Sequence, residues 1–207
     1  MRVLILGASG GTGRLLVNLA LDRGLEVTGA ARNLDTLRAR HPGLPLHPVD
    51  VRDQQALRTV TAGHDAAISV IGGRARTPGG IYSEGGRAIV QALEDEGVRR
   101  FVCVSSGGVA SRDPGLPLWY RLAIPLFMRD LYDDMRRMED IVRDSALEWT
   151  IVRASYLVDK PARREFRVEN GRNPRGGWKI SRSDLAAFLL DQVGSSRWLK
   201  STPTLAY

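Results

Sequence analysis

The chain has 207 residues, of which 43% are hydrophobic, and this length and composition suit one domain with a substantial core. No apolar run reaches the ~18 residues of a membrane span, and the motif near the N-terminus leaves no place for a signal peptide, so we expect a cytoplasmic protein without a membrane span. The net charge of +7 comes from scattered arginines and only three lysines, and this pattern argues against nucleic-acid binding. The single cysteine excludes an intrachain disulfide.

Strand-like and helix-like segments alternate along the chain. Strands are predicted at about 2–6, 25–30, 45–48, 66–71, 99–105 and 149–153, and helices at about 12–23, 33–40, 53–62, 80–97, 126–145 and 183–193. Cys103 lies in the fifth strand, where we expect a buried, inert thiol. Continuously apolar strands separated by helices predict a three-layer α/β/α fold, in which residues 1–207 form a single Rossmann domain around a doubly wound parallel sheet.

The first strand leads directly into a glycine-rich turn and an apolar helix. Gly7 permits the tight turn, Gly10 lets backbone N–H groups approach a diphosphate, and Gly13 lets the helix pack close to the strand. The diphosphate of a dinucleotide would lie at the helix N-terminus, where unpaired N–H groups favour an anion. The alternative is a glycine-rich turn without a nucleotide. The residues predicted to bind the cofactor here are Gly7, Ser9, Gly10, Gly11, Thr12, Gly13 and Arg14.

Residues after the next strands indicate which dinucleotide is preferred. NAD-binding folds usually place an acid at the end of the second strand, whereas this chain has Arg32. Arginine suits a 2′-phosphate through forked hydrogen bonds, so we predict NADP(H); an arginine that only starts the next helix in solvent is the alternative. Asp50 could accept a hydrogen bond from the adenine amino group or could cap the following helix. Gly72 would let the backbone pass close to the cofactor.

Two long irregular stretches, at about 107–128 and 155–182, follow the carboxyl ends of the fifth and sixth strands. Ligands bind at this edge of such sheets, so we expect both stretches to border the substrate site. The first is apolar and aromatic, and Trp119 and Tyr120 are its predicted substrate contacts. It could be a lid over a planar substrate, a helix packed on the body or on a second subunit, or a contact with a membrane surface.

Several segments resemble the atypical short-chain dehydrogenase/reductases that consist of a single NAD(P)-binding domain. The matching segments are residues 7–13, 50–51, 71–72, 83–85, 104–106, 145–153 and 180–186. Within this group, residues 133–145 and the pair of Gly72 and Arg74 are most similar to the biliverdin reductase B / flavin reductase type. The resemblance adds four residues to the predicted cofactor site: Val51, Ile71, Arg74 and Ser105.

The resemblance implies an NADPH-dependent reductase, a monomer or weak dimer, that passes a hydride to a planar conjugated acceptor such as a flavin, quinone or tetrapyrrole. By position it implies that Ser106 lines the site and hydrogen-bonds the substrate or the nicotinamide amide; a serine turn without that role is the alternative. Where the biliverdin and flavin reductases have a histidine after the sixth strand, this chain has Tyr156. A phenol is a weaker acid at neutral pH than an imidazolium, so Tyr156 would be a weaker proton donor than the histidine of those enzymes.

Two other arrangements of catalytic residues deserve comparison. Tyr156 and Lys160 have the spacing of the standard short-chain dehydrogenase pair, but Pro161 argues against the helix that this pair requires. A triad of the serine at 106 with Tyr132 and Arg136 is the other arrangement. No metal site is predicted from the sequence.

Two further functions stay open. The first is a non-catalytic NADP(H)-binding redox sensor or regulatory protein, in which the apolar residues 116–128 would be a partner surface. The second is a nucleotide-sugar epimerase-like enzyme, although the residues after the sixth strand leave little room for the substrate domain of that class.

Overall fold

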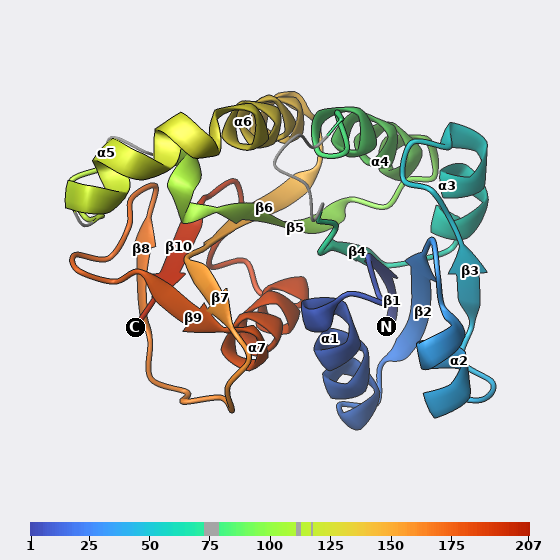
Figure 1. Cartoon of the computed structure of the whole chain (residues 1–207). Helices are drawn as coiled ribbons and strands as arrows, with labels where there is room; N and C mark the ends of the chain where they lie inside the picture. The colour runs from blue at the N-terminus through green and yellow to red at the C-terminus, as the bar shows by residue number, and fades with distance from the viewer. Residues whose placement is uncertain (73–78, 111–112, 117) are drawn as a thin grey trace.

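In the computed structural model of the chain, the described residues are 1–72, 79–110, 113–116 and 118–207, except the side chains of residues 122–126. Eight strands of this described part form one sheet in the order β3-β2-β1-β4-β5-β6-β10-β8 (Figure 1). Their bounds are β1 Arg2–Leu6, β2 Glu26–Ala31, β3 Leu46–Pro48, β4 Ala66–Ser69, β5 Arg100–Ser106, β6 Glu148–Ala154, β8 Arg167–Asn170 and β10 Pro203–Ala206. The strands pair in parallel except β8, which runs antiparallel to β10 at one edge.

The chain winds outward from β1 in both directions. It first runs from β1 through β2 to β3, and then returns to the other side of β1 for β4, β5 and β6. The reversal places the carboxyl ends of β1 and β4 side by side, which is where ligands bind in doubly wound sheets. The predicted Rossmann fold is thus confirmed.

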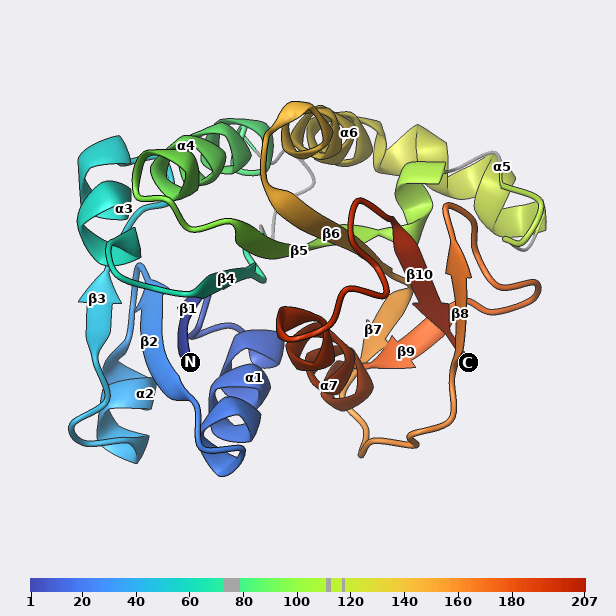
Figure 2. The ribbon, with the colours of Figure 1, turned by 180° about the vertical axis from the view of Figure 1, so that it is seen from behind.

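Helices cover both faces of the sheet (Figures 1 and 2). One layer holds α3 (Gln54–Thr61), α4 (Ser83–Asp95), α5 (Leu118–Phe127) and α6 (Arg129–Asp144), and the other holds α1 (Gly11–Asp22), α2 (Asp35–Arg40) and α7 (Arg182–Val193). A short 3-10 helix, η1, spans Gly107–Ala110 directly after β5. None of the helices in the described part of the chain is long and apolar enough to cross a membrane.

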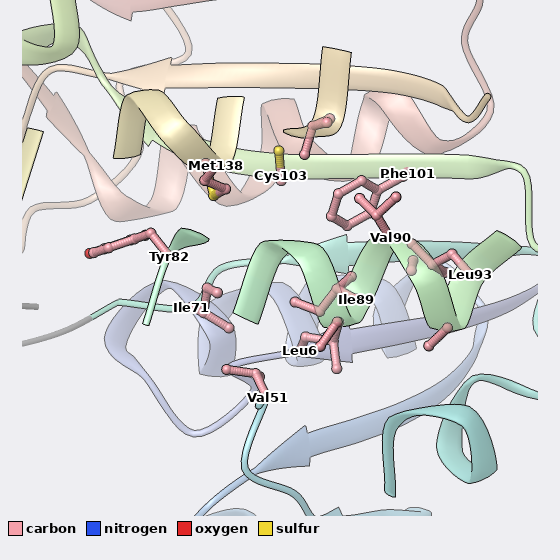
Figure 3. Close-up of a cluster of buried hydrophobic side chains, with 14 of the residues drawn as sticks. Leu6, Val51, Ile71, Tyr82, Ile89, Val90, Leu93, Phe101, Cys103 and Met138 are labelled. Atoms are coloured by element: carbon pink, nitrogen blue, oxygen red, sulfur yellow. The ribbon is translucent and has the colours of Figure 1, made fainter. Parts of the chain in front are cut away.

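Side chains alternate between two hydrophobic clusters, one on each face of the sheet. In β1, Leu4 and Leu6 point into the cluster under α4 and α6, whereas Val3 and Ile5 point into the cluster under α1 and α7. This division explains why the strand is continuously apolar, because both of its faces are buried. Figure 3 shows the first cluster, in which Cys103 is buried and unbridged as predicted, and burial raises the pKa of its thiol.

Both long stretches contain more regular structure than predicted. Residues 107–128 were expected to be irregular, but they contain η1 and α5, so the interpretation of a helix holds for Leu118–Phe127. The prolines at 117 and 125 obscure the helical pattern in the sequence. The second stretch contains β7 (Tyr156–Val158) and β9 (Lys179–Ser181), which pair in parallel as a separate small sheet. Strands this short carry too little alternation to be recognised.

Candidate cofactor and substrate site

The glycine turn between β1 and α1 has the shape of an anion cradle. Gly7 has a φ of +82°, and a Cβ there would lie 2.8 Å from the carbonyl oxygen of Val70. A Cβ on Gly13 would collide with the carbonyl oxygen of Gly7 and approach that of Ala8 to 2.7 Å. Bare glycines therefore let α1 begin directly against the end of β1.

The N-terminus of α1 is arranged to receive a negative charge. Its first residue follows Gly10, which lacks a side chain to cap the helix, and the first turn of this described helix contains no acidic residue. The first N–H groups of a helix have no partner within the helix, and α1 begins just after β1, so a diphosphate at this sheet edge would complete their hydrogen bonding. Arg14 Nη1 donates to the carbonyl oxygen of Ser9 at 3.0 Å. This hydrogen bond holds the positive charge of Arg14 beside the turn. Thr12 is buried beside them, so the predicted residues of the turn fit the group.

Arg32 lies at the same edge, immediately after β2. The N–H groups of Gly7 and Ala8 donate to the carbonyl oxygen of Ala30 at 2.8 and 3.2 Å, which ties the glycine turn to the end of β2. Arg32 is exposed and precedes α2, which begins at Asp35. It does not start that helix, and its exposure is compatible both with a phosphate ligand and with the alternative of an arginine in solvent.

Asp50, after β3, is paired with Arg52 rather than capping a helix. Its carboxylate accepts hydrogen bonds from the Arg52 backbone N at 3.0 Å, from Nε at 3.2 Å and from Nη2 at 3.0 Å. The side-chain hydrogen bond from Arg52 is the largest cause that lowers the pKa of Asp50 to about 2, and the charge of Arg32 adds to it. The cap of α3 is Asp53, which accepts from the Ala56 N–H at 3.0 Å, so the cap interpretation of Asp50 was wrong.

Val51 and Ile71 belong to the core. Both are buried in the cluster shown in Figure 3, and a Cβ on Gly85 at the start of α4 would lie 2.9 Å from Val51 Cγ2 and 3.6 Å from Ile71 Cδ1. Their backbones, but not their side chains, could therefore reach a cofactor. Gly72 is exposed after Ile71, and Arg74 lies outside the described residues.

The two serines at the end of β5 point to different partners. Ser105 is buried, and its hydroxyl donates to Glu139 Oε1 of α6 at 2.6 Å, away from the sheet edge. Ser106 is half-buried, and its Oγ accepts from the Gly108 N–H at 3.1 Å. This contact fits the alternative of a serine that shapes the turn, but a hydroxyl that accepts one hydrogen bond still has a proton to donate to a ligand.

A buried ionic network around Glu139 lies next to Ser105, at the end of β5. Glu139 accepts from Arg153 Nε at 2.9 Å and Nη2 at 2.6 Å, and from Arg143 Nη2 at 2.6 Å. Burial alone would raise the pKa of Glu139, but the hydrogen bonds and charges of these arginines and of Ser105 outweigh it, so the pKa lies below its usual value. The network joins α6 to β5 and β6.

Four aromatic side chains from the two long stretches meet in space, and we name them the aromatic cluster: Trp119, Tyr120, Tyr156 and Trp178. The ring centre of Trp178 lies 6.5 Å from that of Trp119 and 5.9 Å from that of Tyr156. Trp119 is 56% exposed, Tyr156 63% and Trp178 40%. Their exposed faces form a surface that a planar molecule could stack against.

Trp178 is the member of the cluster that sequence reasoning missed. The signal was present, because a tryptophan within a long stretch after a strand's carboxyl end is a candidate ligand contact. Asn173 brings its stretch to the other one: its Nδ2 donates to the Gly107 carbonyl oxygen at 3.1 Å and to Asp113 Oδ2 at 3.1 Å. This polar contact cannot be read from residues so far apart in the chain.

In the described part of the chain, Tyr132 and Arg136 hydrogen-bond to residues other than Ser106 and other than each other. The hydroxyls of Tyr132 and Tyr120 lie 2.7 Å apart, and burial together with this hydrogen bond raises the pKa of Tyr120. Arg136 instead donates from Nε to the carbonyl oxygen of Val109 at 3.1 Å and pairs with Asp133.

The spacing of Tyr156 and Lys160 does not correspond to a helix either. Tyr156 lies in β7, and Lys160 follows that strand outside any helix, as Pro161 predicted. Both residues are exposed. The standard catalytic pair is therefore not formed by these two residues.

Comparison with known proteins agrees with this geometry. The profile of a protein family described as NAD(P)H-binding matches residues 7–196. The UPF0659 protein YMR090W of Saccharomyces cerevisiae is 25% identical over 204 residues, which cover 93% of this chain and 87% of that protein.

Two solved structures share the fold. A short-chain dehydrogenase/reductase from Veillonella parvula, solved in complex with NADP, superposes with a TM-score of 0.82 at 18% identity, covering 100% of this chain and 94% of that one. ChuY of Escherichia coli O157:H7, described as an anaerobillin reductase, superposes with a TM-score of 0.80 at 22% identity, covering 100% of this chain and 97% of that one. At these identities the likeness concerns the fold.

Proposed function

The chain belongs to the NAD(P)H-binding family, and on that premise we propose that it is an NADPH-dependent oxidoreductase that reduces a flavin or a similar planar conjugated acceptor. The observation that carries the proposal is the aromatic cluster, whose exposed rings come from segments that follow β5 and β6, at the edge where the glycine turn also lies. A dinucleotide cradle and an aromatic stacking surface at one edge suit transfer between two flat ring systems.

The glycine turn and its neighbours would bind the cofactor. The N–H groups at the start of α1 would hold the diphosphate, Arg32 would bind the 2′-phosphate, and Asp50 would face the adenine. When bound, the nicotinamide supplies the hydride. This chain's own contribution is then position, because holding two rings face to face removes most of the entropic cost of their meeting.

The two long stretches, at about 107–128 and 155–182, would border the acceptor. Three aromatic side chains would stack on the acceptor and exclude water from one of its faces: Trp119, Tyr120 and Trp178. The hydroxyl of Ser106 would donate a hydrogen bond to a polar group of the acceptor or to the nicotinamide amide. Tyr156 would stand where the biliverdin and flavin reductases have a histidine. Because Tyr156 is well exposed, water can supply the proton that the reduced acceptor takes up.

The direct test is oxidation of NADPH by the purified chain with FMN, riboflavin, a tetrapyrrole and a small panel of quinones, with NADH in parallel. We expect turnover with at least one of these acceptors and a preference for NADPH. Tight binding of NADPH without turnover of any acceptor would contradict the proposal.

A substitution in the aromatic cluster tests where the acceptor binds. Trp178→Ala is expected to raise the KM for the acceptor about threefold to tenfold, the loss expected for one aromatic stacking contact. Leu118→Ala is the matched control, because Leu118 is 65% exposed beside Trp119 but has no ring to stack. Equal effects of both substitutions would argue against stacking on Trp178.

A second candidate is a non-catalytic NADP(H)-binding redox sensor. The observation that favours it is the apolar exposure of α5, where Leu118, Trp119 and Phe127 are each more than half exposed. Such a surface is typical of a protein partner. NADPH binding without turnover, together with a partner whose affinity changes with the oxidation state of the cofactor, would establish this function instead.

A further inference from the structure

Arg182, the first residue of α7, lies over the glycine turn. A Cβ built on Gly11 would lie 3.1 Å from Arg182 Cδ and 3.1 Å from its Nε, so the arginine fills the space that a side chain at position 11 would take. Helices α1 and α7 pack against each other on the same face of the sheet (Figure 1). The guanidinium group is thereby placed beside the first turn of α1, where the N–H groups of the anion cradle begin.

The main chain of Arg182 is fixed by the cap of α7, whereas its guanidinium group forms an ion pair with an exposed carboxylate. Ser181 caps α7 by accepting a hydrogen bond from the Asp184 N–H at 3.0 Å, which fixes the first turn of the helix, where Arg182 lies. The Nη1 of Arg182 lies 2.7 Å from Asp159 Oδ1, but the Asp159 side chain is 85% exposed and that of Arg182 27%. An ion pair with a carboxylate in solvent contributes little to stability, so another anion can replace it easily.

We propose that Arg182 is a ligand of the diphosphate bridge of the bound dinucleotide, and that it exchanges the carboxylate of Asp159 for a phosphate oxygen. A guanidinium group makes forked, charge-assisted hydrogen bonds to phosphate, and here it would act together with the N–H groups of α1. The proposal rests on the proposed cofactor, but it does not depend on which acceptor is reduced.

The position of Arg182 distinguishes its role from that of Arg32. Arg32 follows β2, on one side of β1, whereas α7 packs against β4, β5 and β6 on the other side. The two arginines therefore flank the glycine turn. Arg32 would bind the phosphate that only NADP(H) carries, and Arg182 would bind the diphosphate that NADP(H) and NAD(H) share.

Calorimetric binding of three probes to single variants tests this assignment: NADP⁺, NAD⁺ and adenosine 2′-monophosphate, which lacks the diphosphate. Arg182→Gln is expected to weaken NADP⁺ and NAD⁺ by a similar factor of about ten or more, the loss of one charged hydrogen bond, and to leave adenosine 2′-monophosphate unchanged. A role of Arg182 in fold stability alone would not separate the probes in this way.

Arg23→Gln is the matched control. Arg23 joins the other end of α1 to α7 through an exposed ion pair with Asp191 at 2.6 Å, so this variant loses the same charge between the same helices. Asp159→Asn is the second variant. It removes the carboxylate that competes for Arg182 and leaves Arg182 itself unchanged, so dinucleotide binding is expected to be unchanged or up to about threefold tighter.

Three results would decide against the proposal. Equal dinucleotide affinities of the Arg182→Gln and Arg23→Gln variants would overturn it, and so would weaker binding to Asp159→Asn. If wild-type protein binds neither dinucleotide, the proposed cofactor fails and this inference fails with it. If it binds them but reduces no acceptor, the proposed reductase fails while the assignment of Arg182 is still decided by the binding data.

Discussion

At the scale of single residues, arginines determine the charge at the carboxyl edge of the sheet. Arg52 holds Asp50 as a carboxylate, Arg14 is bound to the glycine turn, and Arg32 is exposed beside them. A 2′-phosphate brings negative charge to this surface. Preference between the two dinucleotides should therefore depend on Arg32, since β2 ends directly beside the glycine turn.

The change Arg32→Ala should weaken NADPH binding by about 1.5–3 kcal/mol, the range for hydrogen bonds to a charged group. NADH binding should barely change, because NADH lacks the phosphate that Arg32 would contact. Calorimetric titration of both dinucleotides measures the difference. The control is Arg40→Ala, which removes an exposed arginine from the far end of α2. Equal losses for NADPH and NADH would refute the role of Arg32.

At the scale of elements, the unit formed by β1, the glycine turn and α1 positions the site. The helix can begin directly against the strand because Gly13 has no side chain, and the obstacle to a side chain there is backbone, not a movable side chain. Carbonyl oxygens of the turn cannot withdraw without breaking the hydrogen bonds from Gly7 and Ala8 to Ala30. The same close packing holds the N–H groups of α1 at the sheet edge.

Gly13→Ala should therefore lower the free energy of unfolding by about 1–3 kcal/mol, the range for overpacking a site that cannot relax. Gly194→Ala is the matched control: nothing lies within 4 Å of its Cβ position, and its φ of −99° suits alanine. That variant should be neutral or slightly more stable. Urea unfolding measures both free energies. Equal stabilities of the Gly13→Ala and Gly194→Ala variants would show that the glycine turn can make room for a side chain at position 13.

At the scale of the whole molecule, three buried carboxylates connect elements that are far apart in the chain. Glu139 joins α6 to β5 and β6. Asp134 accepts from the Tyr82 N–H at 3.0 Å at the start of α4, and Asp184 accepts from the Arg163 N–H at 2.9 Å. Burial alone would raise the pKa of each carboxyl, but the hydrogen bonds that each accepts outweigh it and lower the pKa.

These lowered pKa values predict acid lability. A carboxyl whose pKa is lower in the folded state stabilises the fold above its unfolded pKa, and that contribution disappears as the pH falls toward the folded pKa. With ordinary values of 3.8 for Asp and 4.5 for Glu, the free energy of unfolding should be level at neutral pH and fall once the pH drops below the Glu value.

Urea unfolding at a series of pH values checks this profile, with Glu139→Gln as the variant. Its stability should be about 3–5 kcal/mol lower at neutral pH, because Arg153 is left buried without its partner, and it should fall less steeply in acid. Parallel pH profiles of the variant and the wild type would show that Glu139 does not contribute to the acid transition. If Glu139→Gln does not fold, the wild-type profile alone still tests the predicted onset.

Local patterns in the sequence were sufficient for the Rossmann framework and for the residues of the glycine turn. Apolar periodicity and the steric demands of Gly7 and Gly13 involve neighbours in the chain, so contiguous residues carry that information. One local alternative was wrong: Asp53, not Asp50, caps α3, because both acids follow the same short strand and only geometry separates them.

The tertiary structure decided what the separate segments build together. Trp178 meets Trp119, and Arg182 covers Gly11, only because the sheet order and the packing of α7 on α1 bring these residues to one edge. The helix α5 likewise depends on its packing against α6 more than on its own proline-interrupted pattern. Short-range sterics are encoded in consecutive residues, whereas contacts between distant segments arise from the packing of the whole chain and leave no periodic trace in its sequence.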